Sequence, residues 1–189
     1  TSPERVALRR ALALAYDTPR EISLLRHGQM MPAQSVLPPL ISGHDPALKT
    51  EMSSHDPARA KALLDLYGYV DADRDGWRDR PDGSPLVVDR ASQPDQLNRE
   101  FLTLFSKDMA ALGIRTKTTV AKWPEQLKSA RAGKLQVWGV GGSSAQLDGQ
   151  GALARYDSTQ VGGQNLARFK LAQFDALYQR MALLPDGPE

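Results

Sequence analysis

Residues 85–120 read PLVVDRASQPDQLNREFLTLFSKDMAALGIRTKTTV and decide the expected fold. Residues 85–91 are rich in β-branched side chains, and residues 114–123 alternate like a half-buried strand. Between them, residues 95–112 predict a long amphipathic helix that ends at Gly113. The residues expected to face inward from this helix are Leu97, Phe101, Leu104, Phe105, Met109 and Leu112.

The alternation of strand and helix continues beyond this stretch. Pro124 opens a short predicted helix, and LQVWGVGG (135–142) predicts a third strand. An order of strand, helix, strand, helix, strand usually builds a parallel sheet with right-handed crossovers. We therefore predict an α/β fold, with a mixed or parallel sheet and flanking helices.

Further helices are predicted on both sides of this unit. They cover residues 3–17, a short segment after Pro19, and HDPARAKALLDLY (55–67) before the stop at Gly68. Residues 28–55 lack periodicity and predict a long loop. In these helices and in a final one, the expected apolar stripes comprise Leu8, Ala11, Leu12, Ala15, Ala60, Leu63, Leu64, Tyr67, Phe174, Leu177, Tyr178, Met181 and Leu184.

Composition excludes several classes of protein. At 189 residues the chain can bury one core, and we expect a single domain over residues 1–189. Lys and Arg total 24 against 22 for Asp and Glu, so no strong field favours nucleic acid. The absence of cysteine excludes disulfides and thiolate chemistry. The opening TSPERVALRR has no apolar segment of a signal peptide, and we expect a fragment of a longer protein.

The segment DADRDGWRDRPD (71–82) has the early spacing of a calcium loop, with aspartates at every second position and then Gly76. At the last ligand position Asp82 replaces the usual bidentate glutamate, and the following Gly-Ser-Pro prevents the exit helix that the motif needs. Three arginines also offset the negative charge. We predict a solvated turn and no metal site, with weak calcium occupancy as an open alternative.

The segment LLRHGQ (24–29) resembles the Arg-His-Gly signature of histidine phosphatases, in which the histidine accepts the phosphoryl group. That family also requires a second histidine late in the chain, but here the other histidines are His44 and His55, both in the first third. The alternative function is therefore a phosphoryl-transfer enzyme that uses His27, and the competing interpretation is a histidine in a loop.

Several segments, taken in order, resemble family 5 of the extracellular solute-binding proteins, the dipeptide- and oligopeptide-binding proteins of ABC importers. They are LRRALALAYDTPREI (8–22), MPAQSVLPP (31–39), HDPARAKALLDLYGYVDADRDGWRDRPDGSPL (55–86), LFSKDMAALGIRTKT (104–118) and NLARFKLAQFDALYQRM (165–181). The Asp-Pro helix followed by the Asp-Gly turn is the most specific of them.

The resemblance implies a binding protein rather than an enzyme. Family members have two lobes of a type II periplasmic-binding-protein fold, and this chain is similar to most of the second lobe. The expected protein is a monomer that is periplasmic or extracellular, free or lipid-anchored. It would deliver a peptide or another small polar solute to an ABC permease, without a cofactor and without nucleic acid.

The resemblance also suggests where the solute binds. In peptide binders the loop after the third strand often reads Trp-x-x-Asp-x-x-Asp-Pro, and the earlier aspartate holds the amino terminus of the peptide. Here Asp148 matches the later aspartate, whereas Ala145 stands at the earlier position, so dipeptide specificity does not follow. The candidate ligand-binding residues are Trp138, Ser143, Ser144, Gln146, Asp148 and Asn165. A surface loop without a ligand is the competing interpretation.

Overall fold

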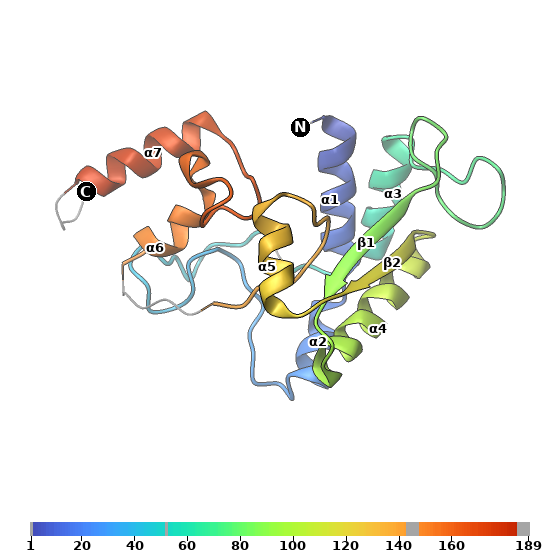
Figure 1. The fold of residues 1–189 in the computed structure, drawn as a ribbon, viewed down its shortest axis with the longest axis horizontal. Helices are drawn as coiled ribbons and strands as arrows, with labels where there is room; N and C mark the ends of the chain where they lie inside the picture. Colours follow the sequence, from blue (N-terminus) through green and yellow to red (C-terminus); the bar gives the residue numbers. More distant parts are fainter. Residues whose placement is uncertain (1, 52, 143–147, 185–189) are drawn as a thin grey trace. The chain divides into compact units, whose positions relative to one another are not determined.

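The computed structural model describes residues 2–51, 53–142 and 148–184 (Figure 1). The chain forms two compact units, which we describe separately. Unit 1 contains residues 1–34, 49–122 and 136–139, and unit 2 contains residues 35–48, 123–135 and 140–189. That both units act as a single domain stays a prediction.

The four helices of unit 1 begin at an aspartate cap, at a proline in the first turn, or at both. The helices are α1 (Pro3–Ala15), α2 (Thr18–Leu25), α3 (Pro57–Leu66) and α4 (Gln96–Ala111). The side chains of Asp17, Asp56 and Asp95 each accept a hydrogen bond from a backbone N–H of the first turn, over 2.9 Å. Proline also occupies the first turn of α1, α2 and α3. The four predicted helices are confirmed.

The sheet of unit 1 has two parallel strands, β1 (Val87–Ser92) and β2 (Arg115–Val120). Val87 pairs with Arg115 at one end of the ladder, and Ser92 pairs with Val120 at the other. The two strands lie side by side, with α4 running along them (Figure 1). The expected α/β arrangement with a parallel sheet is therefore confirmed.

The predicted third strand over residues 135–142 is wrong among the residues that the structure describes. Only Val137 pairs with β1, as a single parallel bridge to Arg90. Two hydrogen bonds hold it, from Ala91 N to Val137 O at 2.8 Å and from Val137 N to Asp89 O at 3.2 Å. Glycines at 139, 141 and 142 then end the pairing, because glycine in a strand loses entropy and packs no side chain.

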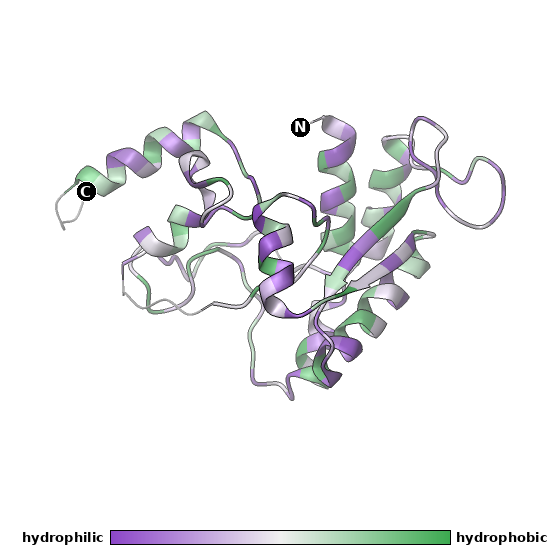
Figure 2. Ribbon diagram, viewed as in Figure 1, coloured by the Kyte–Doolittle hydropathy of each residue, from purple (hydrophilic) through white to green (hydrophobic). Residues whose placement is uncertain are grey.

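The core of unit 1 lies between α1, α3, α4 and the start of the sheet. Its buried residues are Ala11, Leu14, Ala15, Ala60, Leu64, Tyr69, Leu86, Val88, Phe105, Met109, Leu112 and Ile114. Two expectations fail at its edges: Leu97 is 39% exposed in the first turn of α4, and β2 is exposed from Lys117 onward. Figure 2 shows the cause in β2, which is mostly hydrophilic, whereas β1 starts with hydrophobic residues.

Unit 2 contains three helices and two short 3-10 turns in its described residues. They are α5 (Trp123–Arg131), α6 (Gln150–Leu153), η1 (Ala154–Tyr156), η2 (Ser158–Gln160) and α7 (Ala172–Leu183). Helices α5 and α7 were expected, whereas α6 and the 3-10 turns were not. No helix in the described part of the chain is long and apolar enough to span a membrane.

An aromatic cluster packs α7 against the turns of unit 2. The Phe169 and Phe174 rings meet edge to face with centroids 5.6 Å apart, and the Tyr156 ring lies 5.9 Å from Phe169. Tyr178 stacks on Phe174 at 6.3 Å. The expected inward face of α7 is only partly correct, because Leu177 on the same stripe is 59% exposed.

Candidate ligand-binding site

Trp138 lies in unit 1 at the carboxyl end of β1. The segment 136–139 is held beside that strand by the two bonds of Val137 and by a third, from Asp89 N to Gln136 Oε1 at 2.9 Å. Because Val137 pairs with Arg90 in parallel, the chain runs from Val137 toward the carboxyl end of β1. Trp138 is the next residue in that direction. Open α/β sheets bind ligands beyond the carboxyl ends of their strands. The half-buried Trp138 side chain therefore has a position that suits a ligand contact.

The other candidate residues fall in unit 2. Ser143, Ser144 and Gln146 lie outside the described residues, as does Ala145. Asp148 is exposed, and its Oδ1 accepts a hydrogen bond from Gln150 N at 3.0 Å at the start of α6. Asp148 thus accepts a hydrogen bond from the first residue of α6 while its carboxylate stays at the surface.

Asn165 is fully buried, with 0% of its surface exposed. Its Nδ2 donates to Asp157 O at 2.9 Å and to Phe169 O at 2.8 Å, and its Oδ1 accepts from Phe169 N at 3.0 Å. All the hydrogen-bonding groups of the amide are used inside unit 2. We therefore expect Asn165 to shape the segment around it and not to contact a solute directly.

Sequence reasoning missed Arg155, an exposed residue of η1. Its guanidinium lies against Gly142, at the end of the glycine-rich segment after Trp138. A β-carbon built on Gly142 would lie 2.8 Å from Arg155 Nη2 and 3.0 Å from Nη1. No pattern in the sequence links these two positions, which are thirteen residues apart and meet only in the folded chain.

The geometry around His27 does not support phosphoryl transfer. His27 is exposed, has a φ of +51°, and follows α2 in a turn closed by the bond from Gly28 N to Ile22 O at 2.9 Å. The other two histidines have local partners: His44 Nδ1 lies 2.8 Å from Leu37 O, and His55 Nε2 lies 4.0 Å from Asp17 Oδ2. Within the described residues no hydrogen bond joins His27 to an arginine. The loop interpretation holds, and the enzymatic alternative is unsupported.

The carboxylates of the aspartate-rich loop mostly bind the loop itself. Oxygens of Asp71, Asp73 and Asp79 lie within 4.8 Å of one another and could hold a metal ion. However, Asp71 accepts hydrogen bonds from the backbone N–H groups of residues 75 and 76, at 3.1 and 2.9 Å. Asp75, expected as a ligand in the calcium pattern, is instead paired with Arg115. The expected turn is present, and weak calcium binding stays an open alternative.

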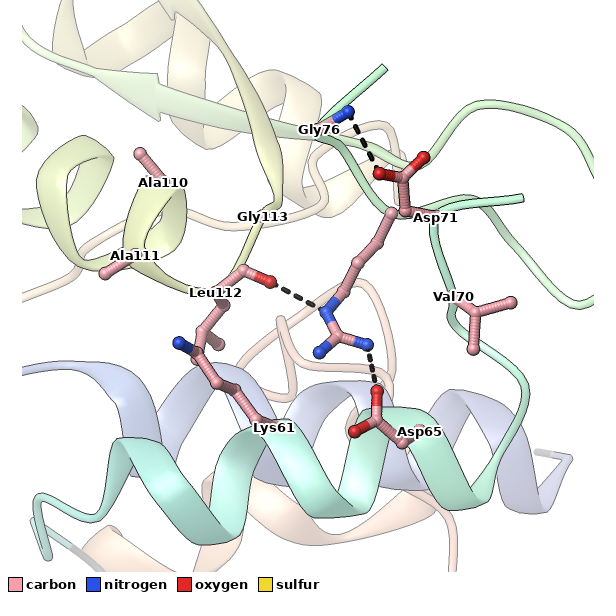
Figure 3. A pocket seen from close by; sticks show the side chains of 10 residues that line it. Lys61, Asp65, Val70, Asp71, Gly76, Ala110, Ala111, Leu112 and Gly113 are labelled. Atoms are coloured by element: carbon pink, nitrogen blue, oxygen red, sulfur yellow. Dashed lines mark hydrogen bonds and ion pairs between the residues drawn. The ribbon is translucent and has the colours of Figure 1, made fainter. Parts of the chain in front are cut away.

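The described part of unit 1 also contains an open pocket of about 420 Å³ at the opposite end of β2 from Val120. Its lining residues are Lys61, Asp65, Val70, Asp71, Gly76, Arg78, Ala110, Ala111, Leu112 and Gly113. Arg78 donates hydrogen bonds to Leu112 O and to Asp65 Oδ1, and Figure 3 shows these two acceptors among the lining residues. The pocket lies at the amino end of β2, whereas ligands of open α/β sheets bind at the carboxyl ends of the strands. The guanidinium of Arg78 in the pocket already binds protein groups. We therefore do not assign the solute to this pocket.

A second polar network in unit 1 ties α1, α2 and β1 together. Tyr16 Oη donates to Glu21 Oε2 at 2.6 Å, and burial together with this bond raises the pKa of Tyr16 well above its usual value. The Arg90 guanidinium lies 4.6 Å above the Phe105 ring. Burial lowers the pKa of Arg90, which Tyr16 and Glu21 partly counteract. These contacts join the end of α1 to α2 and β1 within unit 1.

Comparison with known proteins identifies the family. Residues 3–164 match the sequence model of the bacterial extracellular solute-binding proteins, family 5, middle region. The chain belongs to this family. The resemblance predicted from its helix and turn segments is thereby confirmed.

Individual relatives extend well beyond this chain. It is 30% identical to Heme-binding protein A of Haemophilus influenzae, over 92% of this chain and 30% of that protein. It is also 30% identical to Di/tripeptide-binding protein 2 of Pseudomonas aeruginosa, over 67% of this chain and 22% of that protein. The chain thus spans less than a third of the length of these two family 5 relatives.

A solved structure confirms the fold. The oligopeptide-binding protein AppA of Bacillus subtilis, in complex with a nonapeptide, superposes with a TM-score of 0.84 at 20% identity. The match covers 95% of this chain and 36% of that chain. The expected α/β fold of a type II periplasmic binding protein is therefore correct for this family 5 chain.

Proposed function

We propose that the protein is the solute-binding component of an ABC-type importer. It holds a peptide or another small polar solute without covalent chemistry and delivers it to a membrane permease. The match of residues 3–164 to family 5 carries this proposal. The sequence has no histidine after His55 that could act with His27, which favours binding over phosphoryl transfer.

The chain supplies one side of the solute cleft in this proposal. It corresponds to 36% of the AppA chain, so a longer protein with two lobes would provide the opposite side. Both units of the present chain would then belong to a single lobe. Hinge closure of two lobes around a solute excludes water from the cleft and completes the contacts. The whole protein would act outside the cytoplasm, as a monomer that is free or lipid-anchored.

Two solute classes follow from the relatives. Peptides are supported by the Pseudomonas relative, named for di- and tripeptides, and by the nonapeptide in AppA. Heme is supported by the Haemophilus relative, which matches more of this chain at the same identity. Trp138 suits either class, because its flat ring can stack on a peptide group or on a macrocycle.

The test replaces Trp138 in the full-length protein. Equilibrium dialysis with a pool of di- and tripeptides, and with hemin, measures the affinity of wild type and Trp138→Ala. Loss of a stacked aromatic anchor should weaken binding about tenfold or more. Trp77→Ala is the matched control, since Trp77 is also half-buried but lies in the loop at the other end of the strands. If the wild type binds neither probe, the proposed function is wrong; if only Trp138→Ala is neutral, Trp138 is not in the site.

A further inference from the structure

Unit 2 buries few apolar side chains of its own. Among the residues that the structure describes in this unit, Ile41 and Ala130 are the only buried hydrophobic ones. Unit 1, in contrast, contains all twelve buried residues of the hydrophobic core cluster. Burial of apolar surface is the main driving force of folding, so contacts within unit 2 leave much of its apolar surface without a packing partner.

Helix α7 shows this deficit most clearly. Eight of the twelve residues in its sequence AQFDALYQRMAL are apolar or aromatic, and the structure describes all twelve, none of them buried. A helix of about this length is marginal alone in water and obtains its stability from packing of an apolar face. The contacts of Phe174 with Tyr156 and Phe169 supply only part of that packing.

The apolar side of α7 that lacks packing consists of Leu177 and Leu184, which we call the leucine stripe. The two residues are seven positions apart, about two helical turns, so they project from the same side. Leu177 is 59% exposed and Leu184 is 41% exposed. Leu177 also follows Phe174 by three positions and precedes Met181 by four, which makes it a neighbour of the aromatic face. The stripe therefore widens the apolar surface beyond the part that unit 2 covers.

The rest of a longer polypeptide is the occupant that the observations favour. Heme-binding protein A matches 92% of this chain with only 30% of its own length, and AppA matches 95% of this chain with 36% of its own. A protein of that length has most of its residues outside 1–189. A segment of the same polypeptide is present at a high effective concentration, whereas a separate protein loses translational and rotational freedom on binding.

We infer that an apolar segment of the same polypeptide, from outside residues 1–189, packs on the leucine stripe in the longer protein. Aliphatic or aromatic side chains of that segment contact Leu177 and Leu184 and complete the core of unit 2. The stripe is then part of the protein interior and is not a surface for a separate partner. The inference rests on the longer protein of the proposed function, but not on the identity of its solute.

Cysteine labelling of the full-length protein tests whether the stripe is covered. Residues 1–189 contain no cysteine, so one thiol can be introduced at a chosen position, with any cysteine elsewhere replaced by serine. Leu177→Cys and Leu184→Cys should react with a maleimide about tenfold or more slowly than Gln179→Cys, because a covered thiol reacts only when the contact opens. Gln179 is the matched control, since it is an exposed polar residue on the opposite side of α7 from Leu177.

Photo-crosslinking identifies the occupant. Photo-leucine, a diazirine analogue that keeps the size of leucine, is incorporated throughout the full-length protein, and the monomer is isolated after irradiation. Mass spectrometry then maps the cross-links of the peptide that contains position 177. The inference predicts cross-links from this peptide to residues outside 1–189 within a single molecule.

Three results would overturn the inference. One is an equal maleimide rate for Leu177→Cys and Gln179→Cys in folded protein. Another is a set of cross-links from position 177 that reaches only residues within 1–189. The third is a set of cross-links that occurs only between two molecules, which would assign the stripe to a second copy of the protein. Thermal melting verifies that each variant is folded, and Leu184→Cys carries the labelling test if Leu177→Cys is not.

The labelling and cross-linking experiments use no solute, so their outcomes are separate from the test of the proposed function. A covered stripe in a protein that binds neither peptides nor hemin would refute only the binding function. An uncovered stripe in a protein that binds one of them would refute only the packing of α7.

Discussion

Arg78 Nε donates to the carbonyl oxygen of Leu112 over 2.7 Å and joins the aspartate-rich loop to the end of α4. The same guanidinium donates to the carbonyl oxygen of Tyr69 and to the carboxylate of Asp65. Its side chain is only 13% exposed. Since the last carbonyls of a helix lack partners within the helix, this arginine satisfies one of them and fixes the loop to two helices.

Arg78→Met should therefore destabilise the protein. The substitution leaves two carbonyl groups without their donor, and we expect a loss of about 2–4 kcal/mol in the free energy of unfolding. Urea denaturation of the full chain measures it. Arg80→Met, an exposed arginine of the same loop, is the control and should cost less than about 0.5 kcal/mol. Equal costs for the two variants would show that the bonds of Arg78 are not important for stability.

Calcium should matter little to the loop. Backbone N–H groups already bind Asp71, and Arg115 already pairs with Asp75. We expect the melting temperature to change by less than about 1 °C between calcium and chelator, because a ligand that does not bind the folded state cannot stabilise it. A rise with calcium that is lost in Asp71→Asn would instead establish a metal site at the three clustered carboxylates.

Tyr16 should make the stability sensitive to high pH. The folded protein holds the phenol proton more tightly than the unfolded chain, in which tyrosine titrates at about pH 10. The stability from Tyr16 is thus complete below about pH 10 and falls as the pH rises toward the folded pKa, by about 1.4 kcal/mol per pH unit. Urea denaturation between roughly pH 9 and 11.5 should show a shallower fall for Tyr16→Phe. Parallel slopes would contradict this assignment. Burial also raises the pKa of Tyr69, but its contribution is common to both proteins.

Asn165 should behave as a core residue of unit 2. Asn165→Leu keeps the shape but leaves Asp157 O and Phe169 O without donors, so we expect a loss of about 2–4 kcal/mol. Hydrogen exchange should quicken in residues 154–169, and urea denaturation should report the stability. Gln173→Leu, at an exposed site in α7, is the control. A stable Asn165→Leu protein with lost solute binding would return Asn165 to the list of direct contacts.

Local signals in the sequence predicted the helices and the strand whose formation depends on neighbouring residues in the chain. Helices α1, α3 and α4 follow from aspartate or proline at their starts and from apolar stripes, and β1 follows from its β-branched residues. These features act over a few residues and do not depend on distant parts of the chain. The parallel pairing of β1 with β2 followed from their order around α4.

The failures depend on neighbours that a sequence does not show. A strand over residues 135–142 needed a continuous partner, but only Val137 of that segment pairs with β1. Leu177 was expected inside because of its spacing, yet the aromatic cluster covers only the part of α7 around Phe174. Among the candidate residues, Trp138 could be chosen from its place after a strand. Arg155 could not, since its relation to Gly142 exists only in three dimensions.

Calorimetric titration of the full-length protein with the peptide pool and with hemin, followed by mass spectrometry of the recovered solute, tests the central claim most directly. The account predicts saturable binding with one solute per protein, and recovery of that solute chemically unchanged. Absence of binding to both, or a solute converted during the titration, would contradict it.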